Sequence, residues 1–144
     1  MTRYFDASAL VKGYVDEPGS DAVRRMLSSG ARVATSRIAF AEVASAIARR
    51  CRNGDLTAAT RDRVFATMTR DAQSCQRLDV SDEVVRGAMS LVRDHPLRGF
   101  DALHLASCLL LARSLPVGPE FVCSDAGLLR AASACGLRVV NPET

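Results

Sequence analysis

The segment FVCSDAGLLRAASACGLRVV, residues 121–140, contains the pattern on which the fold depends. Short apolar runs at 121–123 and 137–140 have the length of strands, and the residues 125–134 between them have the apolar spacing of a helix. Two strands that are joined through a helix are expected to lie parallel, because the helix returns the chain to the end at which the first strand began. This segment therefore predicts one unit of a parallel sheet.

The same alternation of strand and helix continues back to the N-terminus. Further strands are expected at residues 3–5, 32–35 and 77–80, and further helices at 7–15, 20–28, 37–52, 57–74, 81–94 and 101–114. Strands separated by helices predict an α/β fold, with a parallel sheet that is covered by helices on both faces. No repeat, low-complexity tract or linker interrupts the pattern, so we expect a single domain over residues 1–144.

The composition is that of a globular protein. Hydrophobic residues make up 48% and charged residues 24% of the 144 positions. No apolar run approaches the roughly 20 residues that a membrane span requires. An acid at position 6 comes too early for a signal peptide, so a cytoplasmic protein is expected. The five cysteines are widely spaced and include no C-x-x-C pair, which disfavours a disulfide framework and a zinc site.

The charge is mildly positive. A formal net charge of +3, carried almost entirely by arginine with Lys12 as the only lysine, suits contact with a polyanion. The same arginine bias is typical of proteins from GC-rich genomes. The charge is therefore compatible with nucleic-acid binding and does not establish it.

Four acidic residues are expected at one edge of the predicted sheet. Asp6 follows the first strand, and Asp125 follows the strand at 121–123. Glu42 lies in the first turns after the second strand, and Asp101 opens the most apolar helix. Ligands of open parallel sheets bind beyond the carboxyl ends of the strands, where these positions converge. Each aspartate taken singly also fits a helix cap, a role that contributes about 0.5–2 kcal/mol.

Glu42 is the acid that a capping role does not explain. Its neighbours three and four positions away along the helix are apolar or small: Ile38, Ala39, Ser45 and Ala46. A glutamate on that face points inward, where an isolated charge is costly, so it requires a partner.

A divalent cation would resolve the repulsion within such a cluster. Two carboxylates about 5 Å apart repel by roughly 3 kcal/mol at an effective dielectric constant near 20. An all-carboxylate set of ligands favours Mg²⁺ or Mn²⁺. One such ion lowers the pKa of a bound water, and a second can stabilise a leaving oxygen, which together suit hydrolysis of a phosphodiester. The residues therefore predict a metal-dependent nuclease with one or two ions.

Four short segments around these acids resemble PIN-domain ribonucleases, and most closely the VapC-type toxins of toxin–antitoxin pairs. The segments are YFDASAL (4–10), IAFAEV (38–43), GFDALHLA (99–106) and CSDAGLL (123–129). Their order and spacing agree with the family across nearly the whole chain. The loop at 116–120 departs from the family pattern, because it is long for its place before the fourth strand.

The resemblance implies a three-layer α/β/α domain with a five-stranded parallel sheet and Mg²⁺- or Mn²⁺-dependent endoribonuclease activity. Asp6, Glu42 and Asp101 would be catalytic metal ligands, and Asp125 would bind the metal directly or through water. Ser8 would orient a metal-bound water or carboxylate. Ser124 would contact the metal ligands without binding the metal itself. The expected partners are an RNA substrate and a cognate antitoxin that covers the acids. The expected assembly is a homodimer that forms a heterotetramer or larger complex with the antitoxin.

Three further residues near this edge are candidates for substrate contact. Arg37 and Arg98 flank the acids and could hold phosphate, although solvated or salt-bridged arginines explain them equally well. His104 lies one turn from Asp101 and could touch the substrate or an acid, although a histidine with a local hydrogen bond is the simpler interpretation.

Two alternatives to a nuclease remain. A non-catalytic RNA- or protein-binding domain with the same fold would bind RNA without consuming it. A phosphoacceptor receiver domain also has a five-stranded parallel sheet and clustered acids, but it usually has adjacent acids early in the chain and a lysine late. Here Asp6 stands alone and Lys12 is the only lysine, which disfavours the receiver.

Overall fold

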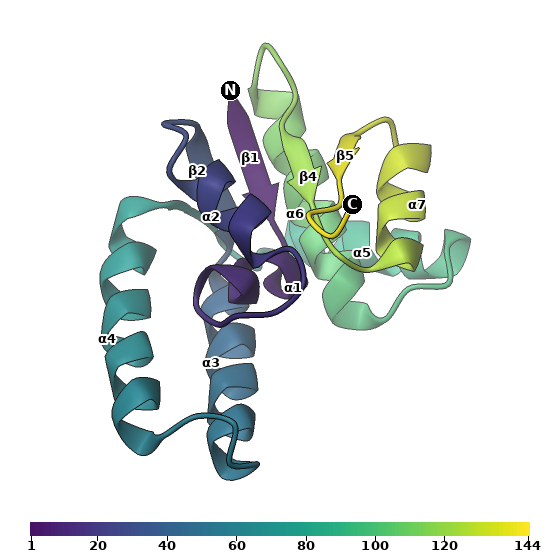
Figure 1. Ribbon diagram of the computed structural model, residues 1–144. Coiled ribbons are helices and arrows are strands. Elements are labelled where there is room, and N and C mark those ends of the chain that lie inside the picture. The colour runs from purple at the N-terminus through teal and green to yellow at the C-terminus, as the bar shows by residue number, and fades with distance from the viewer.

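A computed structural model describes all residues, 1–144, and is built around a five-stranded sheet (Figure 1). The strand order is β3-β2-β1-β4-β5, and every neighbouring pair is parallel. The strands are β1 (Thr2–Phe5), β2 (Arg32–Ser36), β3 (Gln76–Leu78), β4 (Glu120–Val122) and β5 (Arg138–Val140). The sequence prediction of a five-stranded parallel α/β fold is confirmed. Because β1 is central and β4 is beside it, the residues that follow these two strands come out side by side.

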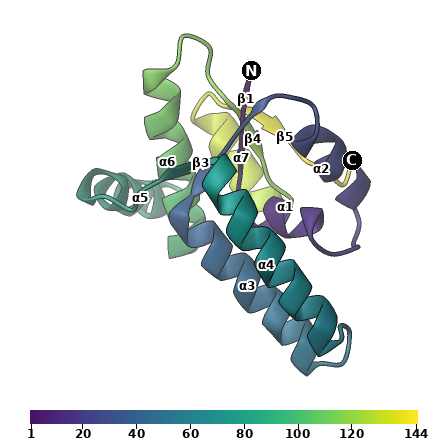
Figure 2. The same cartoon turned by 90° about the vertical axis from the view of Figure 1, so that its left-hand side faces the viewer.

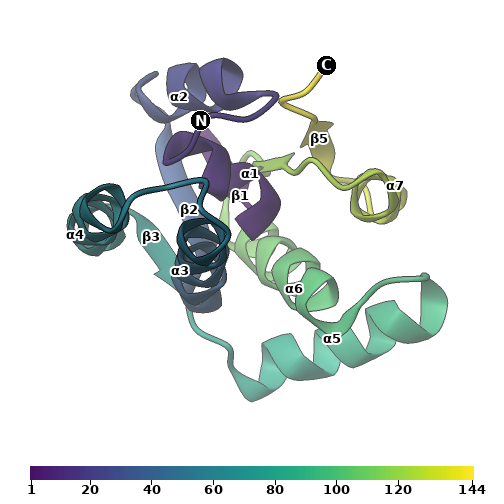
Figure 3. The ribbon, with the colours of Figure 1, turned by 60° about the horizontal axis from the view of Figure 1, so that its bottom comes forward.

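Helices cover both faces of this sheet. In Figure 3, α1 and α2 lie across the sheet from α5 and α6. The helical elements are α1 (Ala7–Leu10), the 3-10 turn η1 (Val11–Gly13), α2 (Ser20–Leu27), α3 (Arg37–Arg52), α4 (Ala58–Ser74), α5 (Asp82–Asp94), α6 (Gly99–Ser114) and α7 (Ala126–Ala134). The three-layer arrangement that the family resemblance implied is therefore present.

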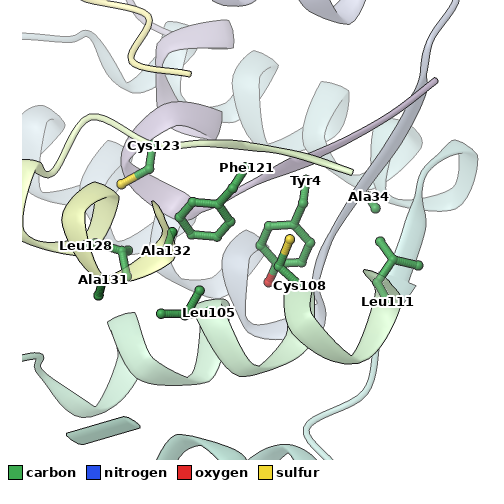
Figure 4. Close-up of a cluster of buried hydrophobic side chains, with 10 residues drawn as sticks. All are labelled: Tyr4, Ala34, Leu105, Cys108, Leu111, Phe121, Cys123, Leu128, Ala131 and Ala132. Atoms are coloured by element: carbon green, nitrogen blue, oxygen red, sulfur yellow. The ribbon is translucent and has the colours of Figure 1, made fainter. Parts of the chain in front are cut away.

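Successive residues of β1 point to opposite layers, as the pleat of a strand requires. Tyr4 belongs to a buried cluster with Leu105 and Cys108 of α6 and Leu128 of α7 (Figure 4). Its ring stacks on Phe121 of β4, with centroids 5.7 Å apart. Phe5 belongs to the opposite cluster, which is supplied largely by α1, α2, α3 and α4. Both central strands, β1 and β4, are buried on two faces. The rim of the sheet, meaning the edge at which the strands end and the predicted acids lie, is therefore attached to a packed core.

Helices α3 and α4 run side by side and extend away from the sheet (Figures 1 and 2). Their contact is apolar, because Ile47 and Met68 are buried in the same cluster as Phe5. The connecting turn contains Gly54, whose φ of 85° lies in the left-handed region that glycine adopts without strain. No helix of the chain combines the length and the apolar character that crossing a membrane requires.

The beginning of α6 differs from the sequence prediction. The helix begins at Gly99, two residues before the expected start at Asp101, and its N-cap residue Arg98 makes no capping hydrogen bond. Asp101 therefore lies within the first turn and does not open or cap the helix. Phe100, the residue before it, is 61% exposed. Asp101 is thus released from the capping role that was its simplest explanation.

Other boundaries moved by only a few residues. The helix expected at 7–15 is divided into α1 and η1, and the strands expected at 77–80 and 121–123 each begin one residue earlier. Ser36, Thr57 and Ser81 cap α3, α4 and α5 with their side chains, which accounts for the accurate prediction of those starts.

Candidate active site

Asp6 lies where the central strand ends. Its backbone N–H donates to the carbonyl of Val122 (3.1 Å), so the β1–β4 ladder reaches to this residue. Its side chain caps α1 by accepting the N–H of Ala9 (2.9 Å). The hydroxyl of Ser8 donates to the same carboxylate, at 2.8 Å from Oδ1 and 2.9 Å from Oδ2. Asp6 is only 3% exposed, so strand, cap and hydroxyl together hold a buried carboxylate in one orientation.

The ionised form of Asp6 is poorly compensated. Burial raises the pKa of this carboxyl above its usual value, against the smaller lowering effects of nearby His104, the Ala9 N–H and the Ser8 hydroxyl. No lysine or arginine forms an ion pair with it. A buried carboxylate without a cationic partner is an environment in which a divalent cation would be favourable.

Asp125 and Ser124 meet Ser8 at the end of β4. The backbone N–H of Ser124 donates to the hydroxyl oxygen of Ser8 (3.1 Å), which joins the two strand ends. The hydroxyl oxygen of Ser124 is buried and has no hydrogen-bond partner. Asp125 caps α7 by accepting the N–H of Leu128 (2.8 Å), and only its Oδ1 is used. The predicted support residues Ser8 and Ser124 therefore lie beside Asp6 and Asp125.

Glu42 has the partner that the sequence required. Its Oε1 lies 2.7 Å from Nε2 of His104, and the other ring nitrogen, Nδ1, lies 2.9 Å from the hydroxyl of Tyr4. The side chain of Glu42 is 26% exposed, whereas that of His104 is 1% exposed. Burial raises the pKa of the Tyr4 hydroxyl well above its usual value, with a contribution from nearby acids, so the phenol remains protonated.

Asp101 shares a surface hollow with Glu42. The hollow has a volume of about 460 Å³ and is lined by Glu42, Arg98, Gly99, Phe100 and Asp101. The Nε of Arg98 donates to Oδ2 of Asp101 (3.3 Å). The side chain of Arg98 is 85% exposed, whereas that of Asp101 is 20% exposed. The arginine is therefore free to leave the ion pair.

The four acids thus lie in two pairs at the carboxyl edge of the sheet. Asp6 and Asp125 follow adjacent strands, Glu42 and Asp101 line one hollow, and His104 is hydrogen-bonded to Glu42. As positioned, no three of the His, Cys, Asp and Glu side chains converge closely enough to hold a metal ion. Each acid instead accepts a hydrogen bond from a protein donor. The ligand chemistry still fits a hard cation, because the donors are carboxylate and hydroxyl oxygens.

The two arginines proposed for substrate contact are both paired. Arg37 forms an ion pair with Asp79 and is 53% exposed, and Arg98 pairs with Asp101. Both side chains lie at the surface, where phosphate can reach them. His104 is enclosed between Tyr4 and Glu42, so its contact is with an acid and not with solvent.

Tyr4 is the site residue that the sequence reasoning missed. A signal was available, since Tyr4 precedes Asp6 by two positions in extended chain at the end of the first strand, and alternate residues of an extended chain point to the same layer. Cys123 was missed as well. Its Sγ accepts the N–H of Asp125 (3.2 Å) and lies 3.8 Å from the Ser8 hydroxyl oxygen, so it fills the space between the two strand ends.

Comparisons with known proteins identify a family and a fold. The family model "PIN domain" matches residues 3–115, a range that contains Asp6, Glu42 and Asp101 but not Asp125. Ribonuclease VapC45 of Mycobacterium tuberculosis (strain CDC 1551 / Oshkosh) and ribonuclease VapC49 of Mycobacterium tuberculosis (strain ATCC 25618 / H37Rv) are each 35% identical to the chain. Each of these alignments covers 97% of the chain and 95% of the relative.

Solved structures share the fold at lower identity. A toxin–antitoxin complex from Klebsiella pneumoniae superposes with a TM-score of 0.67 at 17% identity, over 97% of each chain. VapC20 of Mycobacterium tuberculosis, described as a sarcin–ricin loop cleaving toxin, superposes with a TM-score of 0.66 at 17% identity, over 95% of this chain and 96% of its own.

Proposed function

The chain belongs to the PIN-domain family, and from this premise we propose that it is a metal-dependent endoribonuclease that acts as the toxin of a toxin–antitoxin pair. The observation that carries the proposal is the position of Asp6. It is a buried carboxylate at the end of the central strand, it lacks a lysine or arginine partner, and it lies at the same edge of the sheet as three further acids. The ribonuclease names of the two relatives at 35% identity support the choice of RNA as substrate.

Asp6, Glu42, Asp101 and Asp125 would hold Mg²⁺ or Mn²⁺, Asp125 directly or through water. A bound ion of this kind supplies a Lewis acid for the phosphate and an activated water at neutral pH. Three of the acids use one carboxylate oxygen for a protein donor and leave the other free: Glu42, Asp101 and Asp125. Some of these side chains would have to change rotamer to bind one cation together. Asp101 can do so, because its ion-pair partner Arg98 is 85% exposed and can move away.

The protein's own groups would hold the acids and the substrate. Ser8 keeps both carboxylate oxygens of Asp6 in place, and it is itself held by the Ser124 N–H. The exposed guanidinium of Arg98 can exchange Asp101 for a phosphate of the RNA, because arginine binds both groups with similar geometry. Arg37 can contribute a second phosphate contact in the same way.

We further propose an antitoxin as protein partner. The VapC relatives and the Klebsiella pneumoniae toxin–antitoxin complex support this assignment. An antitoxin segment that covers the acids would bring a positive charge, because the rim presents four carboxylates. The proposed assembly is a homodimer of this chain, completed by antitoxin into a heterotetramer or a larger complex.

The test is cleavage of an end-labelled total-RNA pool by the purified chain in Mg²⁺, in Mn²⁺ and in EDTA. Discrete products in metal that are absent in EDTA and absent with Asp6→Asn would support the proposal. Asp55→Asn is the matched control, because Asp55 is exposed in the turn between α3 and α4 and makes no ion pair. RNA that is bound but never cut by antitoxin-free protein would support the non-catalytic binding domain instead.

A further inference from the structure

We propose that His104 is a positioning residue that fixes the carboxylate of Glu42 at the rim, and that Tyr4 in turn fixes His104. The proposal deepens the proposed nuclease function and rests on it. His104 touches neither solvent nor substrate, since it is 1% exposed, so it would act only through Glu42.

The three residues come from segments that are far apart in the sequence. Tyr4 lies on β1, Glu42 on α3 and His104 on α6, and the two hydrogen bonds span 100 and 62 residues. The imidazole bridges the central strand and α3 from its place on α6. Tyr4 is 0% exposed, so one end of the bridge is anchored in the core.

The geometry selects one tautomer of His104. The carboxylate of Glu42 can only accept, so Nε2 of His104, which lies 2.7 Å from it, carries the ring proton and donates it. In the neutral ring Nδ1 is then an acceptor, and the hydroxyl of Tyr4 donates to it. In this arrangement the neutral imidazole and the phenol each satisfy their donors and acceptors, which a buried polar network requires.

The ring positions are clamped as well as hydrogen-bonded. The Tyr4 ring stacks on Phe121 at an interplanar angle of 11°, and its edge faces the His104 ring with centroids 6.0 Å apart. Neither ring can turn without breaking a packed contact. The direction of the Nε2–H bond toward Glu42 is therefore set by the core.

The consequence falls on Glu42. A glutamate side chain that is 26% exposed is not fixed by burial alone, so several rotamers are open to it. The bond from His104 holds Oε1 and leaves Oε2 free at the hollow that Glu42 shares with Asp101. Groups that orient metal-binding side chains in this way commonly contribute about 10–100-fold to metal affinity or activity.

The experiment measures Mn²⁺ affinity of the full chain by electron paramagnetic resonance of free Mn²⁺, without reference to cleavage. His104→Leu is compared with Leu105→Ala, the matched control. Leu105 is the next residue of α6 and is equally buried, but its apolar side chain forms no hydrogen bond with an acid. Thermal unfolding without metal reports how far each variant is destabilised.

The expected result is a loss of about 10–100-fold in Mn²⁺ affinity for His104→Leu, and unchanged affinity for Leu105→Ala at a comparable loss of stability. His104→Gln, whose amide can still donate to Glu42, should recover part of the affinity. In a Glu42→Gln background, His104→Leu should cause no further loss, because the group through which it acts is already changed. Equal affinities for wild type and His104→Leu, or losses that add in the double variant, would overturn the positioning role.

A second measurement keeps the inference testable if His104→Leu fails to fold. The chain has 2 histidines, so ¹⁵N-histidine spectra can be assigned with the single variant His95→Gln. We expect the Nε2–H tautomer for His104, and a shift of its Nδ1 signal in Tyr4→Phe. A ring protonated on Nδ1 alone would refute the inference, whereas a wild-type chain that binds no Mn²⁺ and cuts no RNA would refute the proposed function.

Discussion

The rim has two regions that are built in different ways. The strand-end region, defined by Asp6, Ser8, Ser124 and Asp125, is held by capping bonds and by neighbours along two adjacent strands. The helix region, defined by Glu42, Asp101, His104 and Tyr4, is held mainly by side-chain bonds between distant segments. One site thus combines acids whose positions are fixed by local backbone geometry with acids whose positions are fixed by side chains of the packed core.

The two regions also differ in how their charges are balanced. Asp6 is 3% exposed and has no arginine or lysine partner, so its ionisation is disfavoured. Glu42 and Asp101 are 26% and 20% exposed, and each has a nitrogen donor beside its carboxylate. A cation would therefore stabilise the strand-end region more than the helix region.

The largest expected effect is the loss of RNA cleavage in Asp6→Asn and, separately, in Asp101→Asn. Each change removes a charge from one region, and we expect each to lower the rate by about a hundredfold or more, because even groups that only support metal ligands contribute about 10–100-fold. Rates are measured on a labelled RNA in Mn²⁺, with circular dichroism to show that the variants are folded. If one variant keeps full activity, its region is not part of the site.

Ser8→Ala should cause the next largest effect. The change removes the hydroxyl that donates to both oxygens of Asp6 and accepts the Ser124 N–H. We expect a fall of about tenfold in cleavage rate, by the general cost of removing a group that orients a ligand. Ser8→Thr keeps the hydroxyl and serves as the control. Equal losses in the two variants would mean that the hydroxyl is not responsible.

Asp6→Asn should stabilise the fold in EDTA at neutral pH, although it abolishes activity. Burial raises the pKa of Asp6 in the folded state, so the native carboxyl prefers to be protonated. The stability linked to that preference is present below the unfolded pKa and is lost as the pH rises through the raised value. Asparagine does not ionise and avoids that loss, so we expect the variant to be more stable than wild type at pH 7.

The measurement is urea unfolding of both proteins in EDTA at pH 7 and at about pH 4, near the pKa of an ordinary carboxyl. The advantage of the variant should shrink at the lower pH, because protonated Asp6 no longer carries a charge. An advantage that is the same at both values would show that the charge of Asp6 is not its cause. With Mn²⁺ present the order should reverse, because wild type alone gains from the ion.

The smallest effect on stability is expected for Arg98→Ala. Its ion pair with Asp101 is exposed on the arginine side, and such pairs contribute within about 0–1 kcal/mol. A small change in stability with a severalfold loss of RNA affinity would identify Arg98 as a phosphate contact. The control is Arg113→Ala, which removes another exposed and paired arginine and should leave RNA affinity unchanged. Equal RNA affinities for the two variants would exclude that role for Arg98.

The sequence was a good guide to the fold because the relevant signals are local. Apolar alternation of strand and helix predicted all five strands, and the caps Ser36, Thr57 and Ser81 gave three helix starts correctly. The start of α6 was wrong, because Arg98 makes no capping bond and Asp101 looked like the cap. A helix start without a side-chain cap leaves no mark in the sequence.

The candidate site was predictable in part for the same reason. Asp6 directly follows β1 and Asp125 comes three residues after the end of β4, so strand prediction placed both at the same edge of the sheet, whereas the pairing of β1 with β4 is seen only in the structure. Glu42 was predicted to need a partner, but the partner could not be identified. His104 is 62 residues away, and its link to Tyr4 depends on how α6 packs on β1. Contacts of this range follow from the packed structure and not from spacing along the chain.

The most direct test of the central claim is to crystallise the wild-type chain with Mn²⁺ and locate the ion by its anomalous scattering. The claim is that acids from both regions of the rim hold one metal centre. We predict anomalous density bonded to a carboxylate oxygen of Asp6 and to one of Asp101, with Glu42 still hydrogen-bonded to His104. Density that contacts acids of only one region, or that lies away from the rim, would contradict the claim.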